Sequence, residues 1–216
     1  MPDFDAETFR TVLRRFATGV AVVTTWDGDR PRGTTVNSFS SVSLRPPLVL
    51  VAFDRNRRIV PALLQTGRYA VNILGEGSRG LADCFAGAPV PSDDSTTPSD
   101  GDPSSGDRRA QLCGAEWRLG VTGLPILVDA IAALECTVVD VHPAGDHDLY
   151  VAQVDAATAG PVAGDAAGAL AADAPRDATS DSMAAGAEPM PLIYYSGRYL
   201  RIERAIAHEL EGKAER

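Results

Sequence analysis

The sequence predicts a mainly β protein built on an antiparallel barrel. Three observations point to this fold class: about seven short segments that are apolar or alternate in polarity, turn sequences between many of them, and only two or three stretches with helical spacing. Closure into a barrel removes the exposed edges that an antiparallel sheet would otherwise present. Because side chains fill the centre of so small a barrel, a large ligand is expected outside it or at a subunit interface.

The first element is expected to be an amphipathic helix over residues 5–18. Asp5 can act as its N-cap, and Gly19 supplies a left-handed stop. Its apolar residues recur at helical spacing and would form one stripe, made of Phe9, Val12, Leu13 and Phe16.

A hairpin is expected next. The turn Asp27-Gly28-Asp29 separates two strand-like segments, residues 20–25 and 32–36, and sequences of this kind join antiparallel strands.

The segment 33–53 is rich in small polar side chains and lies between two apolar strands. Pro46-Pro47 marks a turn, and the continuous apolar run 48–53 is typical of a strand buried on both faces. The hydroxyl and amide groups could bind an anionic, heteroaromatic ligand, but a hydroxyl-rich edge strand without a ligand fits the composition equally well. These groups belong to Thr34, Thr35, Asn37, Ser38, Ser40, Ser41 and Ser43.

Three arginines follow this strand, within residues 54–58, at the expected start of a short helix that runs through Leu64. Cations at a helix N-terminus oppose the helix macrodipole unless an anion lies there. The arginines therefore indicate either a phosphate site or a solvated loop, and the nearby hydroxyls favour phosphate.

The remaining elements are expected to belong to the same single domain, residues 1–216. Two segments poor in core-forming residues, 88–109 and 157–190, are expected to be flexible inserts. The expected strands lie at 68–74, 131–141, 149–154, 192–195 and 198–202, and the expected helices at 78–85 and from Glu203 onward.

Composition limits the function and the compartment. A net charge of −9 provides no basic surface for nucleic acid. Cys84, Cys113 and Cys136 lack metal-site spacing and are expected to be reduced thiols, so no metal site is expected. The chain shows neither a secretory signal nor an apolar run long enough to span a membrane, which predicts a cytoplasmic protein.

Several segments, in order and spacing, resemble the flavin reductase family with the FMN-binding split-barrel fold. The later segments that carry the resemblance include Gly145-Asp146-His147-Asp148-Leu149. The earlier ones are Phe16-Ala17-Thr18-Gly19-Val20, Thr35-Val36-Asn37-Ser38-Phe39-Ser40-Ser41-Val42-Ser43, Pro46-Pro47-Leu48-Val49 and Tyr69-Ala70-Val71-Asn72-Ile73-Leu74; the others are Ala133-Leu134-Glu135-Cys136 and Pro191-Leu192-Ile193-Tyr194-Tyr195.

The resemblance implies a role for particular residues. His147 would lie beside the flavin and contact the nicotinamide, and Arg198 is a further candidate for the cofactor groove or for a dimer contact. Thr35, Val36 and Asn37 would line the isoalloxazine, largely through backbone groups, with Ala52 and Phe53 packed beside it. Phosphate would be bound by Ser40 and Ser41 with help from Asn56, Arg57 or Arg58.

The resemblance also implies an activity. A homodimer would bind FMN or FAD in the groove between subunits and transfer hydride to it from NADH or NADPH, and reduced flavin would pass to a separate oxygenase component. A split-barrel oxidase of another substrate and a non-catalytic flavin carrier remain alternatives. The sequence has no Gly-x-Gly-x-x-Gly motif that opens a helix after a strand, so a separate dinucleotide-binding domain is not expected.

Overall fold

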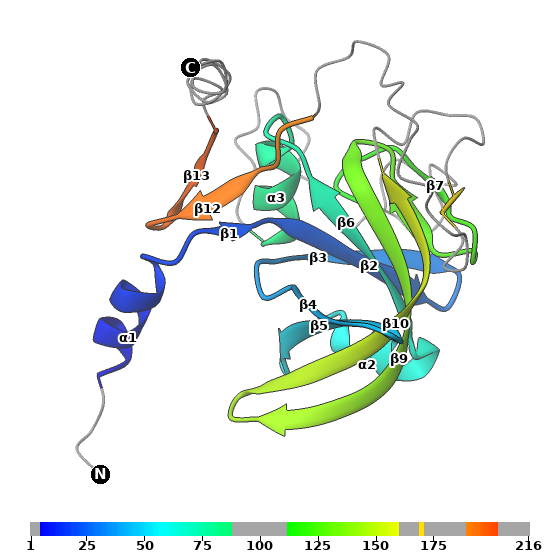
Figure 1. Cartoon of the computed structure of the whole chain (residues 1–216), viewed down its shortest axis with the longest axis horizontal. Coiled ribbons are helices and arrows are strands. Elements are labelled where there is room, and N and C mark those ends of the chain that lie inside the picture. The colour runs from blue at the N-terminus through cyan, green and yellow to red at the C-terminus, as the bar shows by residue number, and fades with distance from the viewer. Residues whose placement is uncertain (1–4, 88–111, 160–168, 171–188, 203–216) are drawn as a thin grey trace, which may run out of the picture.

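A computed structural model describes residues 5–87, 112–159, 169–170 and 189–202, and within them strands predominate (Figure 1). The described helices are α1 (Ala6–Leu13), α2 (Val60–Thr66) and α3 (Arg79–Phe85). None of these described helices has the length and apolar character needed to cross a bilayer. The predicted mainly β, antiparallel fold is confirmed.

The main sheet is a continuous antiparallel path that ends at β3 and at β4. These two end strands follow one another in the chain and are joined by residues 37–39. In spatial order the path is β3 (Arg30–Val36), β2 (Ala21–Asp27), β6 (Arg68–Leu74), β9 (Ala130–Ala144), β10 (His147–Ala159), β5 (Pro47–Asp54) and β4 (Ser40–Leu44), and β11 (Ala169–Leu170) pairs with β10.

Two smaller sheets stand beside the main one. One contains β1 (Thr18–Gly19), β12 (Ile193–Tyr195) and β13 (Arg198–Leu200), and the other contains β7 (Trp117–Leu119) and β8 (Pro125–Leu127). The predicted hairpin β2–β3 is present, and the two predicted strands near the end of the chain form the hairpin β12–β13; glycines with positive φ, Gly28 at 63° and Gly197 at 79°, occupy the two turns.

Aromatic rings fill the interior of the barrel. Tyr69 and Tyr150 are buried, and the Phe53 ring meets them edge-on with centroid separations of 6.4 and 5.3 Å. Burial raises the pKa of both tyrosines above the ordinary phenol value. The filled interior leaves a large ligand no place inside the barrel, so the described residues can bind one only at the surface.

Two local predictions around β5 are wrong. This strand is not buried on both faces, because Val49, Val51 and Phe53 are buried while the alternate residues are only half-buried. The following helix also begins later than predicted. The arginines of residues 54–58 lie before α2, so the helix macrodipole does not act on them in the way that the sequence suggested.

The first helix is shorter than predicted and stands away from the barrel (Figure 1). Asp5 caps it as expected, accepting hydrogen bonds from the backbone N–H groups of Glu7 and Thr8 at 3.2 and 3.0 Å. The helix ends at Leu13, and Gly19 lies in β1 instead of terminating it. The residues of the predicted apolar stripe are exposed, with accessible fractions from 50% at Phe9 in the helix to 75% at Phe16, which lies beyond its end.

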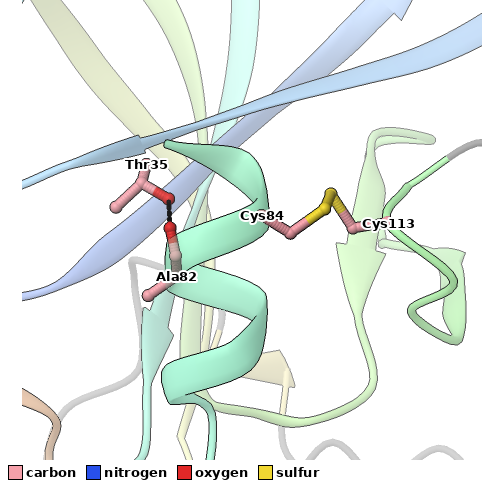
Figure 2. The surroundings of a disulfide bond; sticks show 4 residues. All are labelled: Thr35, Ala82, Cys84 and Cys113. Carbon is pink, nitrogen blue, oxygen red and sulfur yellow. Dashed lines mark hydrogen bonds between the residues drawn. A yellow bond between two sulfur atoms is a disulfide. The ribbon is translucent and has the colours of Figure 1, made fainter. Parts of the chain in front are cut away.

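The expectation of reduced thiols is wrong for two of the three cysteines. Cys84 and Cys113 form a disulfide that joins α3 to the chain before β7, and Figure 2 shows it with its surroundings. Cys136 is a free thiol in the core, and burial raises its pKa to about 12. The pairing could not be predicted from the sequence, because the two half-cystines are 29 residues apart with no characteristic spacing.

The predicted inserts fall mostly outside the described residues. The first, 88–109, lies outside them entirely, as does the predicted C-terminal helix. The second was predicted to start at residue 157, but β10 continues to Ala159 and pairs there with β9. The predicted start of this insert is therefore wrong, because residues 157–159 belong to the long β9–β10 ribbon.

Glu135 is a buried carboxylate on β9 that the sequence did not single out on its own. It accepts hydrogen bonds from the backbone N–H groups of Val121 and Thr122 at 2.7 and 2.8 Å, and one from the Thr122 hydroxyl. A Cβ at Gly120 would overlap the same carboxylate. Glu135 therefore fixes the turn between β7 and β8, which gives this residue a structural role.

Candidate functional site

A cavity of about 650 Å³ lies on the outside of the barrel, where the end of β3 meets β5 and the β9–β10 turn. Its volume is in the range of small-molecule sites, roughly 300–1,000 Å³. The residues that line it are Ala6, Phe9, Arg10, Thr34, Thr35, Val36, Asn37, Ser38, Ala52, Phe53, Asp54, Arg57, Asp146 and His147. The structure thus brings together most of the residues that the sequence proposed for the site.

The floor of the cavity is formed by the last residues of β3 and the loop that follows. Ser38 holds this loop against β5, because its hydroxyl donates to the Ala52 carbonyl at 2.8 Å and accepts from the Ala52 N–H at 3.3 Å. The Thr35 hydroxyl points the other way and donates to the Ala82 carbonyl of α3 at 2.7 Å (Figure 2). The side chain of Thr35 is thus already engaged, which leaves its backbone to face a ligand.

One wall of the cavity is the turn between β9 and β10, which carries His147. The Nδ1 atom of His147 lies 2.7 Å from Oδ1 of Asp146, and His147 pairs with Asp54 across the β5–β10 ladder. The hydrogen bond from His147 lowers the pKa of the Asp146 carboxyl, which favours its ionised form. An ionised Asp146 fixes the orientation of the imidazole, whose ring remains partly exposed to the cavity.

The structure separates the three arginines that follow β5. Arg55 is an ion-pair partner, since its Nε atom donates to Asp148 Oδ1 at 2.8 Å and thereby holds the turn that carries His147. Arg57 and Arg58 are both exposed, but only Arg57 lines the cavity, and it has no carboxylate partner among the described residues. A cation without a partner on a cavity wall can accept an anion.

Several predicted site residues do not line the cavity. Ser40 and Ser41 lie exposed on the adjoining β4, where the Ser40 hydroxyl donates to the Ser41 carbonyl at 3.3 Å. Asn56 donates to Asp54 through its backbone and side-chain nitrogens. Arg198 lies on β13, in a different sheet from the cavity strands.

Other lining residues were absent from the predicted set. Asp146 could have been found from the sequence, because it precedes His147 in the quoted Gly145–Leu149 segment. Arg10 could not, because only the fold brings α1 to the cavity.

The cavity combines backbone polar groups, an apolar wall, an unpaired cation and a partly exposed imidazole. These are the features that a planar heteroaromatic ring with an attached phosphate requires: hydrogen bonds at the ring edge, a flat apolar contact and an anion site. An antiparallel barrel with such a cavity on its outer surface fits the class of flavin-binding proteins with the split-barrel fold.

Comparison with known proteins agrees with this class. The model for the flavin reductase like domain matches residues 13–203, and the chain therefore belongs to the flavin reductase family. The solved structure of the NADH:FAD oxidoreductase SgcE6 of Streptomyces globisporus, in complex with NAD and FAD fragments, matches with a TM-score of 0.68 and 28% identity. That match covers 94% of this chain and 95% of the other.

Two curated relatives support the same assignment. The reductase subunit HsaB of a flavin-dependent monooxygenase from Mycobacterium tuberculosis is 30% identical over 92% of this chain and 83% of its own length. A probable flavin reductase from Rhizobium meliloti is 38% identical over 71% of this chain, but the match spans only 43% of that protein. The family resemblance that the sequence suggested is confirmed, and the chain is an oxidoreductase of the flavin reductase class.

Proposed function

We propose that this chain reduces flavin with NADH and supplies the reduced flavin to a separate monooxygenase. The observation that carries the proposal is the cavity on the outside of the barrel, in which Arg57 and His147 line the same space as the end of β3. The likeness to a solved NADH:FAD oxidoreductase and to a monooxygenase reductase subunit supports both the nicotinamide donor and the oxygenase partner. FMN and FAD are both candidate acceptors.

The cavity residues have distinct roles in this proposal. The backbone of residues 35–37 binds the edge of the flavin ring, and Ala52 and Phe53 form the apolar contact beside it. Arg57 binds phosphate, and Ser40, Ser41, Asn56 and Arg58 remain candidates for a longer phosphate tail that extends beyond the cavity. A flavin held there would supply the hydride acceptor, and the cavity residues would contribute mainly by positioning it against the nicotinamide.

His147 orients the nicotinamide in this account, and Asp146 positions His147. The partly exposed imidazole lies at the cavity wall, and the contact between its Nδ1 atom and Asp146 fixes the orientation of the ring. Its Nε2 atom is then available to the nicotinamide. Neither residue needs to donate a proton to carbon, because hydride transfer requires none. Their contribution is therefore geometric.

Replacement of His147 by alanine tests this role. We expect His147→Ala to lower the rate of NADH oxidation about fivefold and to leave the flavin dissociation constant nearly unchanged, because only the nicotinamide contact is lost. Steady-state kinetics and flavin fluorescence titration measure the two quantities. His142→Ala is the matched control, since His142 lies on the same hairpin, pairs with Asp140 and does not line the cavity. Equal loss of rate and of flavin affinity would instead assign His147 to the structure of the turn.

The proposal includes a homodimer in which a second copy covers α1. The apolar stripe of this helix is exposed, and the same helix contributes Phe9 and Arg10 to the cavity. A partner packed against α1 would remove the stripe from water and fix the helix beside the site.

A charge on the exposed stripe tests the dimer. We expect Val12→Asp to shift the protein from dimer to monomer in light scattering after gel filtration, and to weaken flavin binding in the same sample. Leu119→Asp is the control, because Leu119 is an apolar residue of similar exposure on β7, in a different sheet. The Leu119 variant should still have the mass of a dimer. A monomeric parent protein would refute the proposed assembly.

We further propose that the matched region works as one domain in the cytoplasm. Reduced nicotinamide nucleotides are produced in that compartment, and an NADH-dependent reductase needs a continuous supply of them.

A further inference from the structure

We propose that the Cys84–Cys113 disulfide is a site of exchange with a dithiol, and that its oxidation state sets the affinity of the cavity for flavin. This inference rests on the proposed function, because it concerns flavin binding at the end of β3. It goes beyond that function by assigning a covalent modification site on the opposite side of α3.

The disulfide is accessible to a small thiol. Both cysteines are half-buried, and both line a second cavity of about 790 Å³ that lies between α3 and the segment before β9. Carboxylates of Glu76 and Asp129 line the same cavity. This lining repels anionic thiols and favours an uncharged or cationic dithiol as the reagent.

A direct line of contacts leads from the disulfide to the flavin cavity, and Figure 2 shows its central part. Cys84 lies in the last turn of α3, two residues after Ala82, whose carbonyl accepts the hydrogen bond from the Thr35 hydroxyl at 2.7 Å. The same helix contacts β3 at a second point, where the Phe85 ring packs against Gly33. A Cβ at Gly33 would lie only 2.7 Å from Phe85 Cε1. The position of α3 therefore determines the position of the strand end that forms the cavity floor.

The other half of the disulfide has an unusual backbone. Cys113 has φ of 54°, which residues with a side chain seldom adopt, and Gly114 follows with φ of 71°. The bond to Cys84 helps to hold this conformation, so its cleavage removes one restraint on the segment and one on α3 together. Cys136 cannot replace either partner, because it is buried in the barrel core.

The exchange balances without any other reagent. A thiolate of the dithiol attacks one sulfur of the disulfide, the bond between Cys84 and Cys113 breaks, and a mixed disulfide forms. The second thiol of the reagent then attacks this mixed disulfide. Two electrons and two protons pass to Cys84 and Cys113, which become thiols, and the reagent leaves as a cyclic disulfide. A disulfide in a protein proposed to be cytoplasmic is expected to be of this reversible kind, since that compartment keeps most thiols reduced.

The experiment compares flavin affinity in the two states of the full chain. Oxidised protein and protein reduced with dithiothreitol, then freed of reagent under anaerobic conditions, are titrated with FMN and with FAD by fluorescence. We expect reduction to weaken binding at least fivefold and re-oxidation to restore it. The double variant Cys84→Ser/Cys113→Ser should bind like the reduced protein with or without reagent, while Cys136→Ala should respond like the parent.

A second variant tests the contact path and guards against simple unfolding. Thr35→Val removes the hydrogen bond to Ala82, so reduction of this variant should change flavin affinity less than reduction of the parent does. Circular dichroism checks that reduced protein keeps its sheet. Alkylation should label two thiols in the reduced native protein, because Cys136 is inaccessible.

Two kinds of failure are distinguishable. Flavin affinities that agree within twofold in the two states, with two thiols labelled, would overturn this inference and leave the proposed function intact. Loss of the sheet on reduction would also overturn it, because the disulfide would then serve stability alone. Absence of flavin binding in the oxidised parent protein would instead refute the proposed function.

Discussion

Arg57→Ala is expected to weaken FMN binding roughly tenfold while the affinity for riboflavin, which lacks the phosphate, stays the same. Arg57 lines the cavity and has no carboxylate partner among the described residues, so its charge is available to a phosphate group. The tenfold loss corresponds to one charge-assisted hydrogen bond. The expected loss is at the low end for such a bond, because solvent screens the exposed Arg57 side chain. Fluorescence titration of both ligands against parent and variant measures the difference.

The neighbouring arginine provides the matched control. Arg58 is one position away in sequence, has the same charge and is exposed, but it does not line the cavity. Arg58→Ala should therefore leave both affinities within twofold of the parent. A larger loss of FMN binding in the Arg58 variant than in the Arg57 variant would exchange their roles, and equal losses for FMN and riboflavin would show that the arginine does not contact phosphate.

Glu135→Ala is expected to lower the free energy of unfolding by about 2–3 kcal/mol. The substitution removes the acceptor for the Val121 and Thr122 N–H groups and for the Thr122 hydroxyl, and it leaves a cavity against Gly120. Equilibrium unfolding in urea, followed by circular dichroism, gives the change.

The exposed residue Glu116 controls for loss of charge alone. Its side chain makes no hydrogen bond with any residue that the structure describes. Glu116→Ala should therefore change the unfolding free energy by less than about 0.5 kcal/mol. A Glu135 variant as stable as the Glu116 variant would mean that water satisfies the turn once the carboxylate is gone, and the structural role assigned to Glu135 would be wrong.

The sequence was sufficient to predict the structural elements that depend on neighbouring residues. The β2–β3 and β12–β13 hairpins follow from turn residues between strand-like segments, and the cap of α1 follows from one aspartate at the right offset. The family resemblance added the split barrel and the place of His147. These features need only a few neighbouring residues or a matching motif, so a single sequence is enough to find them.

The features that the sequence did not predict depend on contacts between distant segments. The Cys84–Cys113 bond requires two positions that are 29 residues apart to lie next to each other, and no rule of cysteine spacing predicts that pairing. The proposal of Arg57 as the phosphate ligand depends on two such contacts: Asp148, on another strand, pairs with Arg55, and the fold places Arg57 but not Arg58 at the cavity. The one-sided burial of β5 is likewise set by packing, which overrides local pattern.

Anaerobic stopped-flow absorbance measures whether the protein, with flavin bound in the outer cavity, catalyses flavin reduction by NADH. Protein mixed with FMN or FAD is combined with NADH or NADPH, and the flavin absorbance is followed. We expect rapid bleaching with NADH and one of the two flavins, and a slower rate in the His147→Ala protein. Flavin that binds but is reduced by neither nicotinamide would contradict the proposed function, and a flavin carrier or a split-barrel oxidase would become the better description.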